Sequence, residues 1–244
     1  MASTIATGAG ISSLCTGALI LAIIVLFIYR YVKKRARSIF YLALSTCSWL
    51  GATWSATAIY LLAGWNLPLA IVCQKLVYAF VFAGIVFTLY FAFEIFYENV
   101  KRVFLHVYTT VAIIIISTVF LLDTVDIQAF PDDLAYPLLT IAFEYSIIVV
   151  IFIIPVVLGI LVVVLKMLTR TTDKVSRAGL KFIAGGQFSI LLTFVVDTLA
   201  TVFSTDAVLY PVFLYATWAF PGIGAFLYYL GWIMPDWLKK RIEA

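Results

Sequence analysis

The chain has 244 residues, of which 65% are hydrophobic and 11% are charged, and its net charge is +4. Soluble domains are about 45 to 50% apolar and about 25% charged, so this composition excludes an ordinary soluble domain and indicates an integral membrane protein. Membrane orientation and anionic lipid headgroups account for the basic residues. We therefore expect no nucleic-acid partner.

Seven apolar stretches are long enough to cross a bilayer, which takes about 20 residues in a helix. They predict an all-α membrane protein, a seven-transmembrane helix bundle that forms a single domain over residues 1–244. The expected helices cover residues 10–32, 40–62, 69–97, 103–122, 136–165, 180–203 and 208–232. Residues 234–244 are expected to form a short amphipathic stub on the cytoplasmic side, because Pro235 and Asp236 are typical of a helix start.

The basic residues indicate the orientation of this bundle. Fifteen of the sixteen Lys and Arg residues follow the first, third, fifth and seventh stretches, whereas the other connections contain none. By the positive-inside rule, the N-terminus is outside and the C-terminus is cytoplasmic. The first residues lack a basic region and a cleavage pattern, so we expect the first helix to insert without removal of a signal peptide. The predicted localisation is the cell membrane, with several passes.

The second helix carries an unusual pair of aromatic residues near its middle. Trp49 and Trp54 lie far from the ends of the span, where belt aromatics normally occur. They favour either an aromatic lining of the bundle interior or ordinary core packing.

Disulfide bonds are not expected, because all three cysteines fall within predicted helices: Cys15, Cys47 and Cys73.

Three ionisable residues stand within the apolar stretches. Lys75, Glu144 and Asp197 each lie about six to eight residues from the outer end of a stretch, which is roughly 9 to 12 Å at about 1.5 Å per residue. Charges at this depth usually face a partner or a cavity. We therefore expect an outward-facing pocket where the three converge, lined by Tyr78, Trp54 and Trp218. A Lys75–Asp197 ion pair that only fixes helix packing is the alternative.

Several helices contain residues at which they could bend. Proline removes a backbone hydrogen bond, and glycine allows close approach. We expect conformational roles for four residues in the fifth, sixth and seventh helices: Pro155, Gly186, Pro221 and Gly222.

Enzymatic chemistry is not expected, and no catalytic residue is predicted. The single histidine, His106, offers no imidazole cluster for a metal, so no metal site is expected. The acidic connection before the fifth helix is interpreted as a solvated loop, with weak calcium binding as the alternative. The seventh helix contains no lysine that could carry retinal, so a rhodopsin pigment is disfavoured and no cofactor is expected.

Two families of receptors share the expected topology. Tyr97-Glu98-Asn99 stands where G-protein-coupled receptors carry Asp-Arg-Tyr, which disfavours that family. Residues 38–97, with Trp49, the run from Gln74 to Tyr78 and the run from Phe91 to Glu94, resemble the seven-transmembrane sensor region at the N-terminus of many prokaryotic histidine kinases. The resemblance implies a sensor, with Trp49, Lys75 and Tyr78 at the family-type positions. Members of that family continue from the seventh helix into a signalling module, so we expect either that such a module has been removed from this sequence or that the protein acts through a partner.

The sequence therefore predicts a membrane receptor or sensor module. We expect a small ligand or a proton to bind in the outward-facing pocket, and signalling to pass to a membrane or cytoplasmic protein partner. Two alternatives remain open at this point: a non-catalytic subunit of a larger membrane complex, and a transporter of a small solute or ion.

Overall fold

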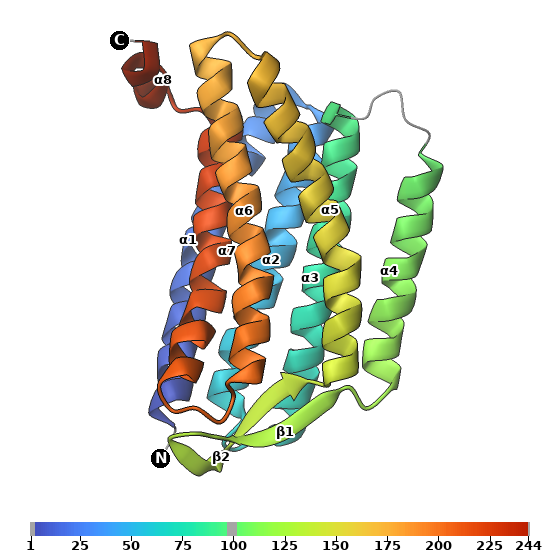
Figure 1. The fold of residues 1–244 in the computed structure, drawn as a ribbon, viewed down its shortest axis with the longest axis vertical. Coiled ribbons are helices and arrows are strands. Elements are labelled where there is room, and N and C mark those ends of the chain that lie inside the picture. The colour runs from blue at the N-terminus through green and yellow to red at the C-terminus, as the bar shows by residue number, and fades with distance from the viewer. Residues whose placement is uncertain (1–2, 97–101, 244) are drawn as a thin grey trace.

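The computed structural model describes residues 3–96 and 102–243 of the chain. In this part, seven long helices run side by side, and a two-stranded sheet lies across one end of them (Figure 1). The long helices are α1 (Thr4–Lys34), α2 (Arg37–Leu62), α3 (Leu67–Phe96), α4 (Val103–Leu121), α5 (Phe143–Arg170), α6 (Lys174–Val202) and α7 (Leu209–Ile233). A short helix, α8 (Asp236–Glu243), follows at the opposite end from the sheet.

Six of these helices are long and apolar enough to cross a membrane: α1, α3, α4, α5, α6 and α7. The helix α2 is long enough, but its Ser, Thr and Trp residues lower its mean hydropathy. It packs against both α1 and α3. The Ser45 hydroxyl donates a hydrogen bond to the Gly84 carbonyl at 3.0 Å and lies 2.7 Å from the Thr88 hydroxyl. The expected helical bundle of membrane type is therefore confirmed in this coarser form.

Two helices begin earlier than hydrophobicity indicates, because polar side chains cap them. The helix α1 begins at Thr4 rather than residue 10, and the Ser3 hydroxyl accepts a hydrogen bond from the Ala6 amide. The helix α6 begins at Lys174 rather than residue 180, because the Asp173 carboxylate accepts from the Ser176 amide at 2.7 Å. Such caps satisfy amides that have no partner within a helix. The predicted boundaries at residues 97 and 244 lie outside the described residues.

The expected start of the fifth helix at residue 136 is wrong. That segment belongs to an antiparallel hairpin formed by β1 (Val125–Phe130) and β2 (Asp133–Ile141), and α5 begins only at Phe143. The hairpin turns at Pro131-Asp132, between strands in which apolar and polar residues partly alternate. The end of this strand is continuous in sequence with the apolar run of α5, and composition does not separate a buried strand from a buried helix.

The helices α6 and α7 approach each other closely through glycine. A Cβ atom added at Gly186 would lie 3.1 Å from the Gly224 carbonyl, and one added at Gly231 would lie 2.9 Å from the Gly179 carbonyl. Small residues permit such contact between membrane helices. Gly222 instead faces α1, where its Cβ would meet the Thr16 side chain at 3.3 Å.

The two prolines lie inside their helices, Pro155 in α5 and Pro221 in α7. Neighbouring helices supply hydrogen bonds beside Pro221. The Thr16 hydroxyl of α1 donates to the Trp218 carbonyl at 2.6 Å, and the Ser189 hydroxyl of α6 donates to the Phe220 carbonyl at 2.8 Å. These two bonds tie the backbone just before Pro221 to α1 and α6. A conformational role for Pro155, Gly186, Pro221 and Gly222 stays a prediction.

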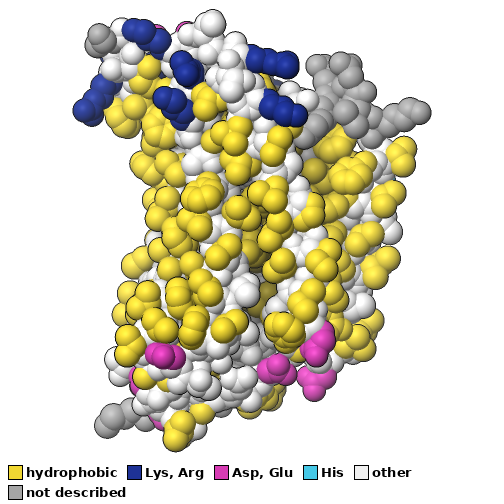
Figure 2. All heavy atoms as spheres, viewed as in Figure 1, with side chains coloured by type: hydrophobic (Ala, Val, Ile, Leu, Met, Phe, Trp, Pro, Cys, Tyr) yellow, Lys and Arg dark blue, Asp and Glu magenta, His cyan; other side chains and the backbone are white. Residues whose placement is uncertain are grey.

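Charged side chains are separated between the two ends of the bundle. On the face drawn in Figure 2, Lys and Arg side chains gather at the end that carries α8, and most acidic side chains lie at the hairpin end. Apolar side chains cover the length between them. This distribution is the one that a bilayer-spanning protein presents to headgroups and lipid tails.

Candidate functional site

A cavity of about 100 Å³ lies inside the bundle near the hairpin end. Six elements supply its walls, namely α2, α3, α5, α6, α7 and the strand β2. Its polar lining residues include Tyr60, Gln74, Tyr78, Asp197 and Tyr210. We call this space the outer cavity.

Asp197 is the one acidic side chain in the lining of the outer cavity. It is half-buried, and it also lines a smaller space of about 30 Å³ beside α5. Among the residues that the structure describes, its carboxylate has no hydrogen-bond partner and no ion pair within 4.0 Å. Its backbone carbonyl accepts from the Thr201 hydroxyl at 3.1 Å. A carboxylate at this depth without a countercharge is costly, which favours a ligand of opposite charge.

Aromatic side chains surround this carboxylate. Tyr60, Tyr78 and Tyr210, which come from three different helices, line the same cavity as Asp197. The Trp218 indole donates a hydrogen bond to the Tyr60 hydroxyl at 3.2 Å, which orients that ring. Aromatic faces attract cations, so the lining suits a positively charged group.

The hairpin covers the outer cavity. Leu138, Leu139 and Ile141 of β2 are buried and face it. Two contacts hold the hairpin in place. The Tyr136 hydroxyl donates to the Tyr60 carbonyl at 2.5 Å, and Asp132 accepts from the Ile5 amide at 3.1 Å and from the Ser3 hydroxyl.

Two titratable groups of the hairpin have shifted pKa values. Burial raises the pKa of the Tyr136 phenol, so this group remains a hydrogen-bond donor. Desolvation works against ionisation of Asp132, but the hydrogen bonds from Ser3 and Ile5 outweigh it and hold the pKa of this carboxyl below its usual range. The charged form of Asp132 is therefore the one that ties the hairpin to the start of α1.

Lys75 does not join Asp197, so the expected convergence of these residues in one pocket is wrong, and so is the alternative of an ion pair between them. Its ammonium group donates to the Leu122 carbonyl at 2.9 Å and to the Phe120 carbonyl at 3.4 Å, at the end of α4. Lys75 follows Gln74, which faces the cavity, and one residue turns about 100° around a helix. The side chain consequently points to α4, where it satisfies terminal carbonyls and complements the helix dipole.

Glu144 and Trp54 also lie away from the outer cavity. Because α5 begins at Phe143, Glu144 falls in its first turn and is exposed, rather than eight residues deep. Trp54 is 48% exposed and packs beside Gly17 of α1. It follows Trp49 by five residues, or about 140° around the helix. Of this pair, Trp49 is the one that faces the interior.

The remaining expected residues, Tyr78 and Trp218, do line the outer cavity with Asp197. Tyr210, Gln74 and Tyr60 also belong to its polar lining but were not among the predicted site residues. Gln74 lies at a depth similar to that of Asp197, counted from the outer ends of their helices, and that depth is a signal that could have identified it. Tyr60 lies only two residues from the outer end of α2, so its depth gave no such signal. Tyr210 lies one residue into α7, where a sequence reading assigns it to the membrane interface.

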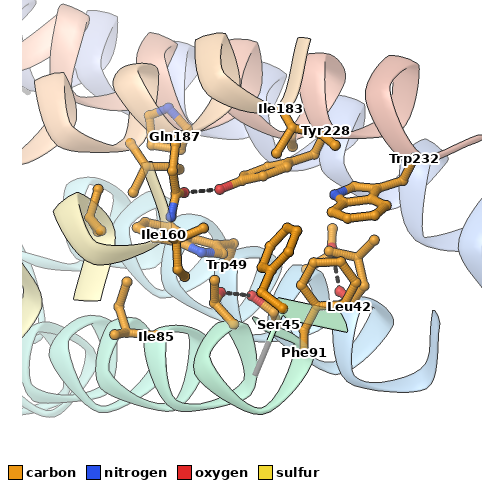
Figure 3. Close-up of a pocket in the computed structure, with 17 residues that line it drawn as sticks. Leu42, Ser45, Trp49, Ile85, Phe91, Ile160, Ile183, Gln187, Tyr228 and Trp232 are labelled. Atoms are coloured by element: carbon orange, nitrogen blue, oxygen red, sulfur yellow. Dashed lines mark hydrogen bonds between the residues drawn. The ribbon is translucent and has the colours of Figure 1, made fainter. Parts of the chain in front are cut away.

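A second cavity of about 40 Å³ lies deeper in the bundle, and we call it the inner cavity (Figure 3). Its central polar residue is Gln187, which is 1% exposed. The Gln187 amide oxygen accepts from the Tyr228 hydroxyl, while its amide nitrogen has no partner among the described residues. The Trp232 indole nitrogen is buried without a partner there too. Trp49 and Pro221 line both cavities, so the two spaces are neighbours.

Within the described residues, no group of three or more His, Cys, Asp or Glu side chains could hold a metal ion. Neither cavity therefore offers a metal site of that kind there. No protein-family model, no curated protein and no solved structure matches this chain.

Proposed function

We propose that this protein is a multi-pass cell-membrane receptor that binds a small organic cation, such as a primary amine, in the outer cavity. The observation that carries the proposal is the Asp197 carboxylate, which faces this cavity without a countercharge among the described residues. In this arrangement, α2 crosses the membrane together with the six more apolar helices, which gives seven spans. The N-terminus is outside, and α8 lies in the cytoplasm. The separation of charges between the two ends supports that orientation.

The lining supports a cationic ligand over an anionic or neutral one. An ammonium group beside Asp197 would replace the water that a carboxylate loses on burial. Tyrosine rings add cation–π attraction, and their hydroxyl groups and Gln74 can accept hydrogen bonds from the same group. An anion would meet the charge of Asp197 instead, and no basic side chain lines the cavity.

The size of the cavity limits the ligand to a few heavy atoms. An apolar protein cavity of about 150 Å³ holds benzene, and the outer cavity measures about 100 Å³. Short alkylamines fit this volume. Larger amines would have to displace the hairpin that covers the space.

Signalling would follow from the helices that the ligand brings together. Asp197 belongs to α6, Tyr210 and Trp218 to α7, and both helices continue to the basic end of the bundle. A cation drawn between them would alter their packing at Pro221, which lines both cavities. The resemblance of residues 38–97 to histidine kinase sensor regions supports this role, with a cytoplasmic protein as the partner.

Ligand-dependent thermal stability of the purified protein tests the proposal. Ethylammonium chloride should raise the unfolding temperature relative to sodium chloride at equal ionic strength, because a ligand at 100 times its Kd stabilises by about 2.7 kcal/mol. Ethanol, a neutral analogue of similar size, should not. Asp197→Asn should weaken the ethylammonium effect roughly 30-fold or more in concentration, whereas Lys75→Met should leave it within about twofold. An equal response in Asp197→Asn would overturn the proposal.

Transport is a second candidate, and one observation favours it. The outer and inner cavities share Trp49 and Pro221, and the inner cavity continues toward the basic end through Trp232. A transporter would move radiolabelled ethylamine into sealed proteoliposomes, and Asp197→Asn would stop this uptake. A receptor would bind the amine with no uptake above that of empty vesicles.

A further inference from the structure

A third space lies at the basic end of the bundle, between the inner ends of α1, α2, α3 and α7. It measures about 80 Å³, and Arg30, Lys34 and Ser38 supply its polar lining. Its walls are apolar side chains that include Phe27, Leu42 and Phe91, all of which are buried. The space thus combines two cations with a hydrocarbon-like surface.

The local backbone brings these polar groups together. Arg30 and Lys34 are four residues apart, so they lie on one face of α1. The chain then reverses at Arg35, whose left-handed backbone (φ 53°) ends α1, and α2 starts at Arg37. No side chain caps the start of α2. The Ser38 hydroxyl, in the first turn of α2, lines the same space as the two cations and is a donor that suits an anion.

The two cations have no protein partner in the part of the chain that the structure describes. The single ion pair found there joins Arg102 to Glu94, at 3.0 Å. No acidic side chain lines the space. The Trp232 indole, which also lines it, has a buried N–H without a partner in the same part of the chain. These groups are all donors or positive charges, so the missing component is an acceptor with negative charge.

We infer that this space is a binding site for the phosphate group of an anionic membrane lipid, held by Arg30, Lys34 and Ser38 with the lipid's apolar part against Phe27 and Phe91. Basic pockets between membrane helices on the cytoplasmic side bind such headgroups. A lipid fits better than a soluble phosphate, because most of the lining is apolar. The inference does not depend on the ligand of the outer cavity.

Native mass spectrometry of the detergent-purified full chain tests this site. The probes are phosphatidylglycerol and phosphatidylcholine, offered at equal concentration. Phosphatidylglycerol should be retained preferentially, because the choline ammonium of the other lipid is repelled by Arg30 and Lys34. The double substitution Arg30→Gln/Lys34→Gln should weaken phosphatidylglycerol retention roughly tenfold or more, since each basic residue contributes about 1 kcal/mol to such binding.

Three controls keep the result interpretable. Lys239→Gln/Lys240→Gln removes the same charge from α8 and should retain the lipid. The exchange Arg30→Lys/Lys34→Arg preserves charge and orientation, so it should also retain the lipid even if the neutral variant folds poorly. Inorganic phosphate at millimolar concentration should not displace the lipid. The inference fails if the α8 variant loses the lipid equally, if the charge-preserving exchange abolishes retention, or if inorganic phosphate displaces phosphatidylglycerol.

Discussion

The outer and inner cavities differ in how their central polar residue is satisfied. In the outer cavity, the Asp197 carboxylate has no hydrogen bond or ion pair among the described residues. In the inner cavity, the neutral Gln187 is bound to Tyr228 and lacks only a partner for its amide nitrogen. A single water molecule can complete a neutral amide, and about 40 Å³ is room for one. An isolated carboxylate needs a countercharge, and this difference makes the outer cavity the candidate ligand site.

Placing a charge in the inner cavity tests this contrast most strongly. Gln187→Glu should destabilise the protein by about 3 to 5 kcal/mol at neutral pH, because the new carboxylate would be buried without a countercharge. Asp197→Asn should be neutral or stabilising without ligand, because it removes such a charge. Thermal unfolding of both variants in the same detergent measures the difference. Equal destabilisation by the two substitutions would show that the cavities do not differ in this way.

The wall of the inner cavity depends on the close approach of α6 and α7. Gly231→Ala should cost about 1 to 3 kcal/mol, because the added carbon would lie 2.6 Å from Ile183 and 2.9 Å from the Gly179 carbonyl. Gly159→Ala on α5 is the matched control, since nothing lies within 4 Å of its Cβ. It should stabilise by about 0.5 to 1 kcal/mol. Unfolding temperatures check both, and ethylammonium affinity should remain unchanged in both.

The hydrogen bond inside the inner cavity predicts non-additive effects of two substitutions. Gln187→Leu should cost about 1 to 3 kcal/mol, because the Tyr228 hydroxyl is left buried without its acceptor. The double variant Gln187→Leu/Tyr228→Phe should cost less than Gln187→Leu alone, because it removes both polar partners. A double-mutant cycle of unfolding free energies measures the coupling. Additive costs would mean that this hydrogen bond contributes nothing.

The smallest effect is expected at the cover of the outer cavity, and it depends on pH. The pKa of Asp132 is lowered in the folded protein, so its hydrogen bonds stabilise the hairpin at pH values above the usual carboxyl pKa of about 3.9. This contribution is lost as the pH falls through the lowered value. Unfolding temperatures between pH 6 and pH 3 should fall more in wild type than in Asp132→Asn. Parallel curves would rule out the contact as a stabilising one.

Hydrophobic runs and single charges predicted much of this architecture. All seven expected stretches contain a long helix. Asp197, which was singled out as a charge within an apolar stretch, lines the outer cavity. Periodicity and depth fix a residue's distance along a helix but not the direction of its side chain. For that reason the sequence did not reveal that the side chains of Lys75 and Trp54 point away from the outer cavity.

The hairpin was missed for a different physical reason. Residues 136–141 extend the apolar run of α5 toward its N-terminal side, but they pair with β1 and form part of a strand. Because of this error, Glu144 was expected well inside the fifth helix, whereas it lies in the first turn of α5. The turn signal at Pro131-Asp132 was present in the sequence and marks where the two strands separate.

The hairpin joins parts of the chain that are synthesised at different times. Its turn is tied to Ser3 and Ile5 at the start of the chain, and the cavity beneath it is completed by Tyr210 and Trp218 of α7. A nascent chain therefore inserts Asp197 before the last wall of its cavity exists. Chains truncated before residue 209 will lack the wall that α7 contributes to this cavity.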